Sequence, residues 1–259
     1  ISIGEPSNET KSHLSALANA GHPIVYREFN DIYDLSAEFF VWEFATACAG
    51  WRIGIDPFDQ PNVQESKDAT KELLNTFVSH GQLPEQHELI ADDSITIFAD
   101  MKDDSLPTSS LLDLLRAFLS KVKTGDYVAL LSYVEETSDI EAELEKIRST
   151  LRDATRCATT SGYGPRFLHS TGQLHKGGAS TGVFFQITAN DAQDFAVPGE
   201  AYTFGILKQA QALGDFHSLS KRGRRAIRVD LGNDTIGGLK KLHALVTEAV
   251  PPKPEAVGA

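Results

Sequence analysis

The sequence has little of three features, each of which would place it in a distinct class of protein. Cys48 and Cys157 are the only cysteines among 259 residues, too few for a disulfide framework, and each lies where a free thiol packs as a small hydrophobe. No apolar run approaches the roughly 20 residues that span a bilayer. Positive charge is also scarce, with 24 lysines and arginines against 36 acidic residues. We therefore expect a protein of the reducing cytoplasm that binds neither membranes nor nucleic acid.

Several catalytic motifs are missing as well. No glycine-rich dinucleotide fingerprint follows an expected strand, and the sequence has no GxSxG elbow and no CxxC pair. His169 and His175 lie six positions apart, which is not the i, i+4 spacing of a metal-binding helix, so a zinc site is poorly supported.

Apolar residues recur in short β-type runs that alternate with helical stretches, which predicts the α/β class with mostly parallel sheets covered by helices in three α/β/α layers. A polar connection at residues 81–93 suggests a division into residues 1–85 and 86–250, followed by a proline-rich tail at 251–259 that we expect to be disordered. We expect helices at residues 8–20, 35–50, 61–80, 109–122, 140–152, 202–221 and 236–249. We expect strands at residues 22–29, 95–99, 127–134, 156–160, 182–188 and 225–231.

The last of these strands carries arginines in a polar and apolar alternation. This pattern predicts that the arginines at 225 and 228 form a solvated face of the sheet rather than a nucleic-acid patch.

The helix expected from Pro61 has an unusual residue on its apolar face. Proline suits a first helical turn because its missing N–H costs nothing there. Helical spacing from Val63 leads through Lys67 to Leu74, so Lys67 takes a position where a core residue is expected. A buried lysine pairs with an acid or exchanges a proton near neutral pH. The alternative is that Lys67 extends along its stem to solvent.

The helix before it, at residues 35–50, is apolar on nearly every side, which predicts a central buried helix. Glu43 interrupts that apolar surface. A buried carboxylate must be paired or protonated, so Glu43 is expected either to pair with Lys67 or Arg52 or to act as a catalytic acid.

The segment from residue 42 to residue 67 resembles the C-terminal signature of phosphoglucose isomerases. The resemblance rests on WEFATA at residues 42–47, GIDPFDQPNV at 54–63 and the lysine at 67. The run GYGPRFLHSTGQLHKGG at 162–178, and AQALGD at 210–215, resemble the short bacterial isomerases, especially those fused behind a transaldolase. The resemblance covers most of the chain and implies a sugar-isomerase-like fold, with residues 1–85 as the C-terminal part of a sugar-isomerase domain.

The resemblance also implies a reaction, the exchange of glucose 6-phosphate and fructose 6-phosphate through a cis-enediol, with no metal or redox cofactor. Gln60 would line the substrate pocket, and Lys67 would move a proton at the ring oxygen as the sugar ring opens. The family's carboxylate base and its Ser/Thr-rich phosphate loop have no match in this sequence. The sequence starts at Ile1 without a methionine, so we expect a piece of a larger protein, inactive alone and a homodimer at full length. Mannose 6-phosphate is an alternative substrate.

The glycine-rich run at 162–178 holds the remaining candidate residues. Its hydroxyls, imidazoles and lysine among glycines suit a phosphate-binding loop, although a turn whose polar groups satisfy the backbone has the same composition. The resemblance favours substrate contacts for Arg166, His169 and Lys176, and we also expect Glu43 among the substrate-binding residues. The sequence therefore leaves two functions open. The chain is either part of a glucose-6-phosphate isomerase or a non-catalytic module that binds sugar phosphate or joins subunits.

Overall fold

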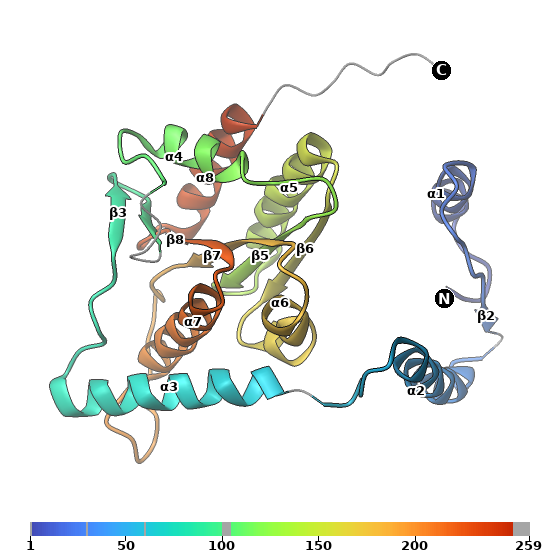
Figure 1. Cartoon of the computed structure of the whole chain (residues 1–259), viewed down its shortest axis with the longest axis horizontal. Helices are drawn as coiled ribbons and strands as arrows, with labels where there is room; N and C mark the ends of the chain where they lie inside the picture. The colour runs from blue at the N-terminus through green and yellow to red at the C-terminus, as the bar shows by residue number, and fades with distance from the viewer. Residues whose placement is uncertain (1, 30, 60, 100–104, 251–259) are drawn as a thin grey trace. The chain divides into compact units, whose positions relative to one another are not determined.

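A computed structural model describes residues 2–29, 31–59, 61–99 and 105–250 (Figure 1). The contacts within the chain divide it into two units, Ile1–Asp59 and Gln60–Ala259. This division precedes the boundary that we predicted at residue 85, and it assigns helix α3 (Pro61–His80) to the second unit. The domain boundary at residue 85 stays a prediction, and the tail at 251–259 lies outside the described residues.

The first unit contains two helices and a minimal sheet. Its elements are β1 (Ser2–Ile3), α1 (Asn8–Asn19), β2 (Glu28–Phe29) and α2 (Asp34–Ile53), and the two strands pair in parallel. The side chain of Ser7 caps α1 by accepting a hydrogen bond from the Thr10 amide at 3.1 Å. Helix α2 ends at Gly54, whose φ of 78° is the left-handed conformation that glycine adopts without strain. The strand predicted at residues 22–29 is confirmed only at its last two residues.

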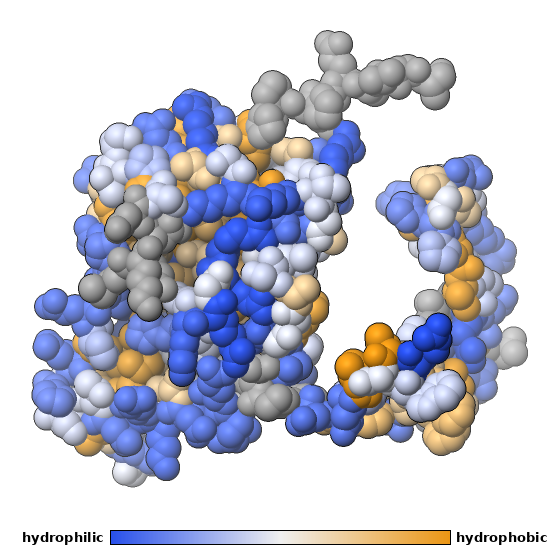
Figure 2. Space-filling model, in the orientation of Figure 1, coloured by the Kyte–Doolittle hydropathy of each residue, from blue (hydrophilic) through white to orange (hydrophobic). Residues whose placement is uncertain are grey.

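Helix α2 exposes the apolar surface that we expected to be buried. Trp51 is 83% exposed and Phe40 is 68% exposed, and the buried residues of the helix are Glu38 and Gly50. Glu38 forms an ion pair with Arg27 at 2.6 Å. The prediction of a central buried helix is therefore wrong for this unit. Two strands of two residues and one short polar helix offer too little surface to cover a helix that is apolar on all sides (Figure 2).

The second unit is built around a six-stranded sheet. Besides α3, its elements are β3 (Glu88–Ala91), β4 (Thr96–Phe98), α4 (Leu111–Leu119), β5 (Tyr127–Tyr133), α5 (Ser138–Thr155), β6 (Ala158–Tyr163), η1 (Arg166–His169), α6 (Gly172–Gly177), β7 (Gly182–Thr188), α7 (Phe204–Lys221), β8 (Arg225–Asp230) and α8 (Thr235–Ala249). The strand order in the sheet is β3-β4-β8-β7-β5-β6. Strands β8, β7, β5 and β6 are parallel, and the hairpin β3-β4 joins β8 antiparallel.

Helices cover both faces of this sheet, which confirms the predicted three-layer α/β fold. Figure 1 shows α4, α5 and α8 on one side of the sheet and α7 with α6 on the other. The larger core lies under α4, α5 and α8, and it includes Leu114, Ile147 and Leu242. Helix α4 shows why such a segment folds as it does. The Ser110 hydroxyl accepts a hydrogen bond from the Asp113 amide at its start, and the apolar residues that follow lie on the face turned to the sheet.

Helix α3 packs on α7, and this contact forms the floor of the candidate site. Leu73 of α3 is buried with Ala210 and Leu213 of α7. A Cβ on Gly214 would lie 3.2 Å from the backbone nitrogen of Thr70, so glycine at this position permits the close approach of the two helices. Within the described residues no helix is both long and apolar enough to cross a membrane.

Candidate functional site

The first candidate site is a cavity of about 270 Å³ between α3, the η1 segment and α7. Lys67 lines it together with Ser66, Thr70 and Lys71 of α3, and His169 lines it from η1. Two predicted site residues that are far apart in the sequence thus share one cavity. No aspartate or glutamate occurs among the described residues that line it, so the cavity is cationic within a protein of net charge −12.

Lys67 reaches this cavity from the surface of α3. Its side chain is exposed, whereas Ser66 is only 3% exposed. Of the two positions considered from the sequence, the solvent-directed one is therefore correct and the core-facing one is wrong. The face of α3 that carries Ser66 and Leu73 is turned toward α7, so Lys67 lies at the edge of the contact between the two helices.

Lys176 is buried next to Ser66, below the cavity that Lys67 and His169 line. Its ammonium forms an ion pair with Asp215 of α7 at 2.5 Å and donates to the Ser66 hydroxyl at 2.5 Å. The side chains of Lys176 and Asp215 are each 1% exposed. Burial raises the pKa of Asp215 above its usual value, and the neighbouring Lys176 opposes that rise. Lys176 therefore joins α6, α3 and α7 below the site, where it can orient Ser66 but is shielded from a ligand.

His175, next to Lys176, lies among aromatic rings. Its Nδ1 is 2.9 Å from the Tyr127 hydroxyl, and its ring contacts those of Phe167 and Phe184. Burial lowers the pKa of His175 to about 4, and the charge of Lys176 acts in the same direction. Burial likewise raises the pKa of Tyr127 to about 12. His175 is therefore neutral at neutral pH and part of the interior rather than a proton carrier.

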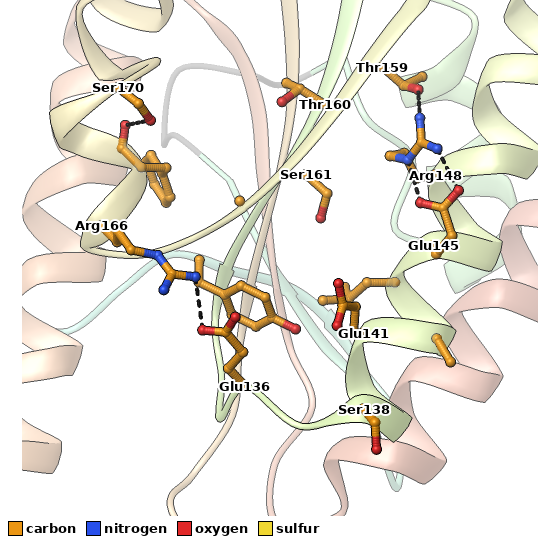
Figure 3. Close-up of a pocket in the computed structure, with 15 residues that line it drawn as sticks. Glu136, Ser138, Glu141, Glu145, Arg148, Thr159, Thr160, Ser161, Arg166 and Ser170 are labelled. Carbon is orange, nitrogen blue, oxygen red and sulfur yellow. Dashed lines mark hydrogen bonds and ion pairs between the residues drawn. The ribbon is translucent and has the colours of Figure 1, made fainter. Parts of the chain in front are cut away.

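Arg166 belongs to a different and larger cavity of about 940 Å³ along α5 and the edge strand β6. It forms an ion pair with Glu136 at 2.8 Å. Arg148 binds Glu145 through two nitrogens and donates to Thr159 at 3.0 Å. Figure 3 shows these two charged groups on either side of Ser161. Because its arginines are already paired with glutamates, this cavity is a weaker candidate for an anionic ligand.

The remaining predicted residues lie elsewhere. Glu43 is exposed on α2 in the first unit, with no ion pair to another described residue. Gln60 lies outside the described residues. The described residues contain no group of three or more metal-ligating side chains.

Sequence reasoning missed Asp215 and Arg228 as residues of interest. Asp215 interrupts the apolar run of α7, a signal that could have marked it as a buried partner. The prediction that the arginines of β8 form a solvated face is wrong for Arg228, which is 6% exposed. Helices cover both faces of the sheet, so the alternation in β8 could not place that side chain in water.

No protein-family model matches the chain, and no curated protein matches it in sequence. Among solved structures, the chain is similar to the crystal structure of a hypothetical protein, TT0462, from Thermus thermophilus, with a TM-score of 0.47 and 15% sequence identity. That similarity covers 56% of this chain and 40% of the Thermus chain.

Proposed function

We propose that the second unit binds a sugar phosphate in the cavity of Lys67 and His169, as part of an aldose-ketose isomerase acting on glucose 6-phosphate and fructose 6-phosphate. The observation that carries this proposal is the composition of that cavity. Two lysines, a histidine and hydroxyl groups line it without a carboxylate among its described residues. Such a lining suits a phosphate group and sugar hydroxyls.

The position and exposure of each side chain indicate what it can do in the site. Lys67 is exposed and can donate a proton to the ring oxygen as the ring opens. Lys71 and His169 lie in the same cavity and can hold the phosphate. Ser66, held by the buried Lys176, can orient a sugar hydroxyl. Transfer of a proton between C2 and C1 needs a carboxylate base, which this lining lacks, so we propose that the chain alone binds substrate but does not isomerise it.

Calorimetry with fructose 6-phosphate tests this proposal. The wild-type chain should bind, and Lys67→Met should weaken binding by about tenfold, as expected for loss of a charge-assisted hydrogen bond. Lys240→Met, which changes an exposed lysine of α8, is the matched control. Equal affinity of the wild type and Lys67→Met would remove Lys67 from the site. Conversion of fructose 6-phosphate in a dehydrogenase-coupled assay would contradict the proposal that the chain is inactive alone.

The exposed face of α2 favours a second candidate function, which is to join two copies of the chain in a homodimer. Phe40, Phe44 and Trp51 of this helix are all more than half exposed. Aromatic side chains bury about 150–250 Å² each, and a stable interface needs about 800 Å² per partner, so a few such residues supply much of that area. Sedimentation should show a dimer for the wild type and a monomer for Phe40→Ser with Trp51→Ser. Phe204→Ser, at an exposed aromatic residue of the second unit, should stay dimeric. A monomeric wild type would contradict this function.

A further inference from the structure

A third cavity of the second unit, of about 310 Å³, lies at the carboxyl ends of the parallel strands. Its lining includes Tyr133, Thr188 and Asp230, which are the last residues of β5, β7 and β8. Tyr133 pairs in register with Thr188, and Thr188 with Asp230, so the three residues form one row across the sheet.

The topology makes this end of the sheet a preferred place for a ligand. From β5 the chain passes through α5 to β6 on one side, and from β7 it passes through α7 to β8 on the other. Helices α5 and α7 cover opposite faces of the sheet. The order therefore reverses between β5 and β7, and open α/β sheets bind ligands outside the carboxyl ends of the strands at such a reversal.

Arg228 gives this cavity an unusual electrostatic character. Arg228 is only 6% exposed, and its guanidinium carbon lies 4.0 Å from the centroid of the Phe98 ring. Its side chain has no hydrogen bond or salt bridge to another described residue, and its Nε is buried without a partner. Burial lowers the pKa of Arg228 to about 10, which Asp230 partly opposes. A buried cation held by an aromatic face alone is costly unless an anion neutralises it.

Two further polar atoms of the cavity lack partners. Tyr133 is 1% exposed, and its hydroxyl is buried without a hydrogen bond. The Oε1 of Gln86 is also buried without a hydrogen bond. Both residues line the cavity beside Arg228. Buried polar groups are almost always satisfied, so three orphan atoms around one cavity point to a group that binds there.

The other charges of the cavity are already engaged. Asp230 accepts hydrogen bonds from the Thr188 hydroxyl at 2.6 Å and from the Gly232 amide at 3.0 Å. Lys208 donates to Asp191 at 2.5 Å and to the Ala189 carbonyl at 3.1 Å. Of the two cations among the described residues of this lining, Lys208 and Arg228, Arg228 is thus the one with no carboxylate bound to it. Asp230 keeps acceptor capacity for a ligand hydroxyl.

We propose that this cavity binds a small organic anion that also carries hydroxyl groups. Arg228 and the Tyr133 hydroxyl donate to the anionic group, and Gln86 and Asp230 accept from the hydroxyls. The cavity volume lies at the lower end of the range of about 300–1,000 Å³ found for ligand sites. Lys67 and His169 do not line it, so the site is separate from the proposed sugar-phosphate cavity.

Calorimetry on the whole chain tests this site with two matched ligands, glycerol 3-phosphate and glycerate, which carry the same hydroxyl pattern with different anions. Glycerol supplies hydroxyls without an anion, and inorganic phosphate supplies an anion without hydroxyls. At least one of the two ligands should bind more tightly than both controls, and their order shows whether a phosphate or a carboxylate is preferred. Absence of binding by both ligands, or binding of either control as tight as that of the better ligand, would overturn the proposal.

Substitutions of lining residues test whether the ligand binds in this cavity. Arg228→Gln should weaken binding by about tenfold or more because it removes a charged donor. Arg116→Gln, at an exposed arginine of α4, should have no effect. Tyr133→Phe removes only an unpartnered hydroxyl, so it should fold normally and still weaken binding. Unchanged affinity in both Arg228→Gln and Tyr133→Phe would overturn the site. Lys67→Met should leave this binding intact; a loss there would assign the ligand to the other cavity.

Discussion

The second unit contains two buried cations in opposite states. On the paired side, toward α6, Lys176 meets the carboxylate of Asp215 and the hydroxyl of Ser66, and the cluster is closed to solvent. On the unpaired side, beside the cavity at the strand ends, Arg228 rests on Phe98, with no anion bound to it among the described residues. A paired buried charge fixes how elements pack, whereas an unpaired one beside a cavity lowers stability in exchange for binding. Burial alone therefore does not distinguish a structural cation from a functional one.

The largest effect should come from breaking the paired side. Lys176→Met leaves Asp215 buried without a counter-ion, which should reduce the free energy of unfolding by about 3–5 kcal/mol. Urea denaturation measures this change. The double variant Lys176→Met with Asp215→Leu removes both charges and should recover much of the loss. A single variant as stable as the wild type would mean that the pair does not fix the packing of α6 on α7.

An intermediate effect should appear in the pH dependence of stability. The pKa of His175 falls from 6.5 to about 4 on folding. The unfolded chain then binds more protons between these values, so stability rises with pH from about 4 to 6.5, by about 3 kcal/mol for a shift of this size. Denaturation at a series of pH values should show this slope in the wild type. It should persist in His169→Gln, which changes an exposed histidine, and become smaller in His175→Phe. An equal slope in all three proteins would contradict burial of a neutral His175.

The smallest effect should come from the unpaired side, and its sign should be opposite. Arg228→Met replaces a buried unpaired charge with an apolar side chain of similar length, which should raise stability by about 1 kcal/mol in the absence of ligand. The melting temperature, compared with that of Arg116→Met, measures this change. A clear loss of stability in Arg228→Met would show that its contact with Phe98 outweighs the cost of the buried charge, and the two buried cations would then both stabilise the fold.

Local patterns in the sequence predict much of the second unit. Pro61 begins α3 where expected, and the apolar run at β7 matches the predicted strand, Gly182–Thr188. The short helix α6 was missed because glycines flank it, and β3 was missed because it lies in a polar stretch. Neither residue type nor spacing could give the strand order, which depends on contacts between distant segments.

The candidate sites were harder to predict than the fold. The shared cavity of Lys67 and His169 depends on the packing of α3 beside η1, which no local pattern encodes. Arg228 was assigned to a solvated face because alternation in a strand indicates two different environments but does not show what covers the polar one. In α2 the apolar pattern was recognised correctly, but the surface that covers such a helix must come from residues other than those of its own unit.

The antiparallel hairpin at the edge of the sheet affects the order in which this chain can fold. Strand β4 ends at Phe98, whereas its partner β8 begins only at Arg225. Helix α3 likewise packs on α7, which follows it much later in the sequence. During synthesis from the N-terminus, the segment from α3 to β4 would leave the ribosome long before the strand and helix that hold it. We expect these early segments to remain without stable tertiary contacts until synthesis is nearly complete. A chain ending before residue 225 should then exchange the amide hydrogens of β4 rapidly.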